Sequence, residues 1–171
     1  MLFRSDADSS ADSSKKLGGH LNLISSMSFS PDGSLIVTGC YDKKVRVYKD
    51  VTVATPETTE VNSDDNNNDV TVATLNETTE VNSVSWSPQG DKIVSGHWDN
   101  IVRVWDFYSG ECTLVQGHTT GVNSVSFSGD KIVTGSSIYV WVWEPNSEET
   151  YDCTHMLKGH EEVVVSVSCS G

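Results

Sequence analysis

Histidine is the residue type in this sequence best suited to acid-base or metal chemistry, because imidazole titrates near neutral pH and binds zinc. The chain contains His20, His97, His118, His155 and His160. No two of them have the HxxxH or HExxH spacing that places two imidazoles on one metal ion. His20, His118 and His160 instead end the tripeptides GGH, QGH and KGH, and this regularity indicates a structural role. No metal ligand is predicted.

Cysteine is the second residue type that could bind a metal or act as a nucleophile. Positions 40, 112, 153 and 169 show no CxxC pair and no short Cys/His spacing, so we predict small reduced core residues. The sequence also lacks a nucleophile elbow, a glycine-rich phosphate loop and a converging pair of carboxylates. We therefore predict no catalytic residue and no cofactor, and that the chain is not an enzyme.

The composition limits the partners. The chain has 171 residues, enough for one domain, with 11 basic against 24 acidic side chains and a formal net charge of -13. This charge repels phosphate backbones and anionic lipid surfaces, so neither nucleic acid nor a membrane is a predicted partner. No apolar run is long enough for a secretory signal or a membrane span. The expected location is intracellular, cytoplasmic or nuclear.

The chain divides into two regions of different composition. Residues 1–17 are rich in Ser and Asp without a hydrophobic period, which predicts a disordered tail. Residues 18–171 contain short runs of β-branched and aromatic residues separated by Pro-Asp-Gly or Ser-Gly turns, and no helical period. This second region is predicted to be all-β.

The β region repeats itself. Three stretches align as variants of one sequence: MSFSPDGSLIVTGCYDKKVRVYKD at 27–50, VSWSPQGDKIVSGHWDNIVRVWDF at 84–107, and VSFSGDKIVTGSSIYVWVWEP at 125–145. The repeat length is about 40 residues, the period of a propeller blade made of four short strands. A fourth unit begins with GHEEVVVSVSCSG.

These repeats, with their Gly-His turns and the VRVWD motif at 102–106, resemble the WD-repeat (WD40) β-propeller family. The resemblance implies an incomplete propeller of about three four-stranded antiparallel blades plus an orphan strand. The expected blades are 18–75, 76–116 and 117–157, with a partial blade at 158–171. Within a blade of this family the strands run a, b, c from the centre outwards, and the outer strand d leads to the next blade.

The alignment places the strands of each blade. Strand a is expected at 23–29, 81–86, 122–127 and 163–168. Strand b is expected at 35–38, 92–95 and 131–134. Strand c is expected at 44–48, 101–105 and 138–143. Because blades stack radially, each strand must be apolar on both faces, as IVSG and VRVW are.

The family resemblance implies a hydrogen-bonded structural tetrad in each blade, made of a His, a Ser or Thr, an Asp and a Trp. The matching residues of the three blades are His20, Thr38 and Asp42; Ser95, Asp99 and Trp105; and His118, Thr134 and Trp143. No blade has all four, because Tyr48, Glu77 and Ser137 stand at the remaining positions. Two carboxylates close together repel. We therefore predict that Glu77 turns away from Asp99 into water.

Recognition is the remaining class of function. The b to c turns GCYD and GHWD share one rim of a propeller with the Gly-His turns, which places Tyr41 and Trp98 at equivalent positions there, beside His97. Large exposed aromatic residues are favoured anchors for a partner. Tyr41, His97 and Trp98 are therefore predicted to bind a protein or peptide. The alternative is that the aromatic residues only cap the end of their own blade.

Two readings of the function stay open. The first is a non-catalytic scaffold for protein interactions, of the WD-repeat type. The second is a fragment or truncated gene product of a larger multidomain signalling or ubiquitin-ligase-adaptor protein, in which the array is the sensor or substrate receptor. Three blades cannot close a ring of four to eight. Self-association that closes the propeller is therefore a further alternative.

A tandem duplication interrupts the first repeat. VTVAT occurs at 51–55 and again at 70–74, with the polar run DDNNND between the copies. Counting back from strand a places the later copy, from Thr71, in register as strand d of the first blade. Residues 51–69 are then an insertion in the loop from c to d, which costs little because closure entropy grows slowly with length. Whether the first copy forms an extra outer strand or a loop stays open.

Overall fold

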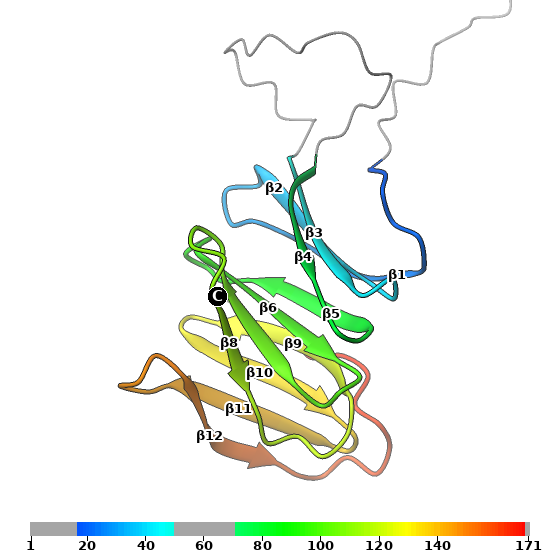
Figure 1. Cartoon of the computed structure of the whole chain (residues 1–171). Helices are drawn as coiled ribbons and strands as arrows, with labels where there is room; N and C mark the ends of the chain where they lie inside the picture. The colour runs from blue at the N-terminus through cyan, green and yellow to red at the C-terminus, as the bar shows by residue number, and fades with distance from the viewer. Residues whose placement is uncertain (1–16, 50–70, 170–171) are drawn as a thin grey trace, which may run out of the picture.

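Residues 17–49 and 71–169 form the described part of this protein in a computed structural model. The predicted tail, except for residue 17, and the predicted insertion at 51–69 lie outside the described residues. Figure 1 shows three small sheets that follow one another, with the first at the top and the third at the bottom. We call these sheets blades one, two and three.

Each blade is a four-stranded antiparallel sheet whose strands are neighbours in chain order. Blade one consists of β1 (Ile24–Phe29), β2 (Leu35–Cys40), β3 (Lys44–Lys49) and β4 (Thr71–Asn76). Blade two consists of β5 (Val81–Trp86), β6 (Lys92–His97), β7 (Val102–Asp106) and β8 (Cys112–Val115). Blade three consists of β9 (Val122–Ser128), β10 (Lys131–Ser136), β11 (Tyr139–Pro145) and β12 (Tyr151–Leu157). The prediction that strand d of blade one begins at Thr71 is confirmed.

The hydrophobic cores lie between blades. One core joins residues of β2 and β3, such as Val37 and Val47, to Val84 and Trp86 of β5. The other core joins blade two to Phe127 and neighbouring residues of blade three. Because β6 lies between blades one and three and is covered on both sides, it buries consecutive residues rather than alternate ones. The stacking of the blades therefore creates the core.

A glycine on the second strand of each blade permits the close approach of the next blade. A Cβ on Gly39 would lie 2.7 Å from Val81 Cγ1 and 3.0 Å from Val84 Cγ1. A Cβ on Gly96 would lie 2.8 Å from Val122 Cγ1 and 2.9 Å from the equivalent carbon of Val125. No side chain fits in this space, so glycine is required for the inner strand of one blade to pack on the second strand of the blade before it.

Polar side chains also link successive inner strands. Asn82 Nδ2 of β5 donates to the carbonyl oxygen of Val122 in β9 at 2.9 Å. The amide of Val125 in β9 donates to Ser83 Oγ of β5 at 3.1 Å. These bonds repeat one blade further on, where Asn123 Nδ2 donates to the Val164 carbonyl oxygen at 3.1 Å. The alternating SVSW and SVSF sequences therefore fix the position of each blade along its neighbour.

Residues 163–168 differ from the prediction of a fourth inner strand. They lie against blade three, where Val164 and Val167 face Gly135 as Val122 and Val125 face Gly96. They are not part of a sheet, because the described residues supply no second strand for them to pair with. The predicted orphan strand is therefore in place but unpaired.

The prediction that all the cysteines are core residues is wrong for two of them. Cys40 is buried at the end of β2, whereas Cys112 and Cys153 are exposed. The exposed pair lies on β8 and β12, the outermost strands of their blades. An outermost strand has no neighbouring strand on its far side, and its side chains reach solvent.

We expect Gly96→Ala to destabilise the protein by about 1 to 3 kcal/mol, because the new methyl group overpacks against Val122 and Val125. Urea unfolding measures the change. Gly18→Ala is the matched control, since nothing lies within 4 Å of a Cβ at that position. Equal stability of the two variants would contradict the role of glycine at the joint.

Candidate functional site

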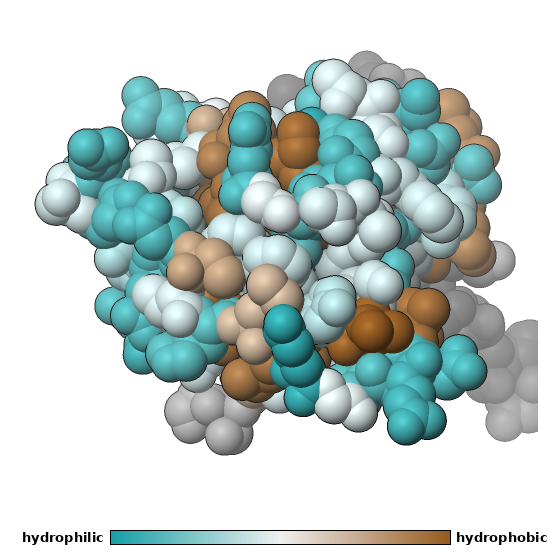
Figure 2. Space-filling view, turned by 90° about the horizontal axis from the view of Figure 1, so that it is seen from below, coloured by the Kyte–Doolittle hydropathy of each residue, from teal (hydrophilic) through white to brown (hydrophobic). Residues whose placement is uncertain are grey.

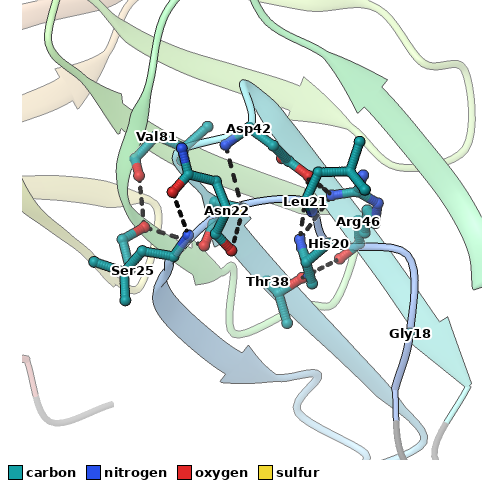
Figure 3. Close-up of polar contacts among 12 residues, drawn as sticks. Gly18, His20, Leu21, Asn22, Ser25, Thr38, Asp42, Arg46 and Val81 are labelled. Atoms are coloured by element: carbon teal, nitrogen blue, oxygen red, sulfur yellow. Dashed lines mark hydrogen bonds and ion pairs between the residues drawn. The ribbon is translucent and has the colours of Figure 1, made fainter.

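Blade one holds a buried polar network at one rim (Figure 3). His20 Nε2 lies 2.7 Å from Thr38 Oγ1, and the Leu21 amide donates to Asp42 Oδ2 at 3.0 Å. The Arg46 guanidinium lies 2.7 Å from His20 Nδ1 and 2.8 Å from Asp42 Oδ2. Because guanidinium can only donate, Nδ1 accepts and Nε2 carries the proton toward Thr38. The structure therefore brings the three tetrad candidates of blade one together, around an arginine.

The same corner contains the donor atoms of a possible metal cluster. Among the described residues, one ligand atom each from His20, Cys40 and Asp42 lies within 4.8 Å of the others. The Arg46 guanidinium, which bonds both His20 and Asp42, already supplies positive charge there. Burial acts to raise the pKa of Asp42, but hydrogen bonds from the Leu21 amide, Cys40 and Arg46 outweigh it and lower that pKa. A metal ion would have to displace the arginine.

Tyr48 occupies the tryptophan position in blade one. Its hydroxyl donates to the Gly18 carbonyl oxygen at 2.8 Å, and its ring lies beside that of His20 with centroids 5.9 Å apart. The side chain is fully buried. Tyr48 thus stabilises the Gly-His segment by a hydrogen bond to the backbone of Gly18, whereas the tryptophans of the other blades bond the central hydroxyl.

Blade three holds a second network, with a hydroxyl at its centre. His118 Nε2 lies 2.8 Å from Thr134 Oγ1, and Trp143 Nε1 donates to the same oxygen at 2.9 Å. Burial lowers the pKa of His118 to about 4, so the imidazole is neutral near pH 7. The structure therefore brings the three candidates of blade three together.

Blade two completes its network with a histidine that the sequence predicts to bind a partner. His97 is fully buried, and its Nε2 lies 2.9 Å from Ser95 Oγ. Trp105 Nε1 donates to the same hydroxyl at 3.3 Å. The prediction that His97 binds a partner is wrong, because the ring has no exposed surface. Its position next to Gly96, where the other blades have Cys40 and Ser136, was the sequence signal for this role.

Glu77 is also placed differently from the prediction that it turns into water. Its side chain is only 1% exposed, with Oε2 3.1 Å from Arg103 Nε and Oε1 3.8 Å from His97 Nε2. Arg103 allows Glu77 to be buried near Asp99. Its guanidinium also binds Asp99 at 2.7 Å, and its positive charge reduces the repulsion between the two carboxylates. Burial nevertheless raises the pKa of Glu77 to about 7, against the opposing charge of Arg103.

The arginines are functional parts of these networks that sequence reasoning missed. Arg46 and Arg103 occupy the same position in VRVY and VRVW, four residues after Asp42 and Asp99. Blade three has Ser137 near the aspartate position and Trp141 at the arginine position. The charge pair is therefore replaced as a unit. Trp141 stacks on Trp143 and meets the His118 ring at 4.7 Å between centroids.

Tyr41 and Trp98 meet at one groove on this rim. The groove has a volume of about 420 Å³ and is lined by Leu23, Ile24, Ser25, Tyr41, Asn82, Trp98, Asn123, Val163 and Val165. Trp98 is 57% exposed. Its ring also lies over Gly121 in the turn before β9, where a Cβ would be 3.4 Å from Trp98 Cε3. Trp98 therefore contacts the neighbouring turn with one part and leaves more than half of its surface available.

The sequence matches the family described as WD domain, G-beta repeat over residues 11–49, 70–106 and 110–144. These stretches contain β1 to β3, β4 to β7 and, to within one residue, β8 to β11. They cover more than half of the chain, which therefore belongs to the WD-repeat family. Proteins of this family are generally non-enzymatic scaffolds for protein interactions.

Similar proteins share the repeats over most of this chain. Periodic tryptophan protein 2 homolog of Caenorhabditis elegans is 29% identical over 91% of this chain and 16% of its own length. Ribosome biogenesis protein WDR12 homolog of Arabidopsis thaliana is 26% identical over 93% of this chain and 41% of its own length. A solved structure of U3-55K superposes with a TM-score of 0.71 at 19% identity, over 89% of this chain and 44% of that chain. The chain spans less than half the length of each, and the structural likeness shows the fold.

A search of the described residues for a helix long and apolar enough to cross a lipid bilayer finds none.

We expect Thr134→Val to destabilise the protein by about 1 to 3 kcal/mol, because it leaves the buried ring nitrogens of His118 and Trp143 without their common partner. Chemical denaturation followed by tryptophan fluorescence measures the loss. Thr154→Val on the exposed strand β12 is the control. If both substitutions have the same small effect, the hydroxyl is not the centre of the network.

We expect Glu77→Gln to stabilise the protein more at about pH 8 than at about pH 5. The folded pKa of Glu77 lies near 7, above its ordinary value of 4.5. Its contribution is therefore complete below pH 4.5 and is lost as the pH rises through about 7, whereas glutamine stays neutral. His97 and His118, whose pKa values are lowered to about 4, act in the opposite sense, but they are common to both proteins.

The measurement is the difference in unfolding free energy between variant and wild type at each pH. Glu111→Gln, in an exposed position before β8, gives the baseline for removing one surface charge. A difference that is the same at both pH values would show that Glu77 is not held in a site that disfavours its charge.

Proposed function

We propose that this chain is a non-catalytic scaffold that binds a protein or peptide in the rim groove. One observation supports the proposal most strongly: equivalent turns of blades one and two place Tyr41 and Trp98 at the same groove. Aromatic side chains bury a large area with little loss of conformational freedom, which favours them as anchors. The family, whose members generally bind proteins, supports the same class of function.

The lining of the groove favours an extended segment with apolar side chains. Leu23, Trp98, Val163 and Val165 are exposed there and gather apolar surface at one groove. The amides of Asn82 and Asn123 donate to backbone carbonyls and keep the floor of the groove in place. An apolar side chain of the partner would displace water from this surface.

The charge of the chain supports the choice of a protein over a nucleic acid. A formal net charge of -13 disfavours a polyanion and favours a partner that is neutral or basic. We also propose an intracellular location, in line with a relative named as a ribosome biogenesis protein. The alternative, a receptor array within a larger multidomain protein, uses the same groove and has no observation that favours it over the scaffold.

The test is a display library of natural peptides, selected on the wild-type chain. We expect selected peptides to bind Trp98→Ala and Tyr41→Ala at least about tenfold more weakly, because each substitution removes an anchor at the groove. Binding is measured by fluorescence anisotropy, and unfolding is measured in parallel.

Tyr108→Ala is the matched control. Tyr108 is an exposed aromatic residue in the turn after β7, at the opposite rim from the groove, and should not affect binding. Selected peptides that bind all three variants equally would contradict the proposal. Loss of folding in the groove variants would mean that these rings cap their own blades.

A further inference from the structure

Residues 163–169 have backbone amides that are available to pair with another strand. Val167 N and Cys169 N donate to the hydroxyls of Ser124 and Ser126 in β9, at 3.0 and 3.2 Å. Alternate amides of an extended chain point to opposite sides, so the amides of Ser166 and Ser168 face away from blade three. In the described part of the chain these two amides have no hydrogen-bond partner.

The segment is held in the geometry of an inner strand. Its contacts with Gly135 repeat those of Val81 and Val84 with Gly39. Its amide bonds to serine repeat those by which Val84 N donates to Ser26 Oγ at 3.2 Å. The joint between blades, formed twice inside the chain, is therefore formed a third time with only one strand on the far side. The open edge continues an existing interface.

The opposite end of the array has the complementary defect. Ile24, Met27 and Phe29 of β1 are 40%, 64% and 56% exposed, whereas their equivalents in β5 are 0%, 3% and 5% exposed. Figure 2 is seen from below, which is the side of blade three in Figure 1, and there too apolar side chains form separate patches among hydrophilic ones. In the described part of the chain no blade packs on the far face of β1, so β1 is the strand of blade one that is displaced at least cost, and residues 163–169 have no second strand. Any second copy of the chain presents both halves.

We propose that two copies of this chain associate by strand exchange, in which residues 163–169 of one copy pair with β2 of the other and replace its β1. The equivalence of the two segments fixes the register. Ile24 lies opposite Cys40, and Phe29 lies opposite Ile36. Val164, the counterpart of Ile24, is then placed opposite Cys40 of the second copy.

The exchange places blade one of the second copy against blade three of the first. The ladder on β2 is preserved, because one inner strand replaces another. The displaced β1 gives up the bonds from Ser25 Oγ to the Gly39 and Val81 carbonyl oxygens, and those from the amides of Val84 and Trp86 to Ser26 and Ser28. The closure of both open ends must outweigh this loss. The reciprocal exchange closes a ring of about six blades, within the range of four to eight that propellers adopt.

The experiment compares the full chain with Ser166→Pro and Ser166→Ala by size-exclusion chromatography with light scattering over a range of concentrations. Proline removes the amide that faces the open edge and costs no bond to blade three, whereas alanine keeps the amide. We expect dimers of the wild type and of Ser166→Ala, and monomers of Ser166→Pro. Ser168→Pro should behave like Ser166→Pro. Circular dichroism verifies folding.

A wild-type monomer at all concentrations would overturn the proposal, as would a dimer that persists in both proline variants. A second measurement does not depend on proline. Under mild oxidation, Val164→Cys should form a disulfide-linked dimer with Cys40 of the second copy. The link should disappear when Cys40→Ser is added, although Cys112, Cys153 and Cys169 remain. A link that survives Cys40→Ser would also overturn the register and the exchange.

Discussion

The fit of a valine pair against a glycine at each joint between blades is the contact on which the rest of this structure depends. Gly39 and Gly96 let the inner strand of the next blade approach so closely that a Cβ would overlap it. The hydrophobic cores lie between blades, so a looser joint would open the core itself. The same approach brings Asn82 and the inner-strand serines within hydrogen-bonding distance of the next backbone. The close approach at these glycines therefore determines the hydrophobic core, the register between inner strands and the arrangement of the rim.

The buried networks show how one joint tolerates different chemistry. In all three blades an imidazole forms a hydrogen bond with a central hydroxyl, which belongs to Thr38, Ser95 or Thr134. In blade two the imidazole comes from His97, and Glu77 occupies the space left beside Arg103. In blade three the charge pair is exchanged for stacked indoles. Buried polar atoms near the hydroxyl are compensated by hydrogen bonds or charge, with the exceptions of His97 Nδ1, His118 Nδ1 and Trp141 Nε1, which have no hydrogen-bond partner among the described residues.

The repeat pattern was sufficient to predict the strands, because every blade must solve the same packing problem with the same residue types. The later VTVAT copy could be assigned by register for the same reason. The position of Glu77 could not be predicted by comparing it with Asp99 alone, because the answer depends on Arg103, a residue of strand c outside the aligned tetrad. The burial of His97 is hidden in the sequence for a related reason. Its rim position suggests exposure, but Glu77 stands where the other blades have the Gly-His histidine, and His97 takes the place of that imidazole beside Ser95. The groove could not be predicted, because the spacing of Tyr41 and Trp98 in the sequence does not give the distance between their side chains in space.

Native-state hydrogen exchange tests the central claim, that stability comes from joints between blades rather than from individual sheets. The account predicts that amides of β6, in the blade with a full neighbour on each side, exchange most slowly. Amides of β2, in a blade with one neighbour, should exchange faster, although both strands are central in four-stranded sheets. Equal protection of β2 and β6, with each sheet opening independently of its neighbours, would contradict it.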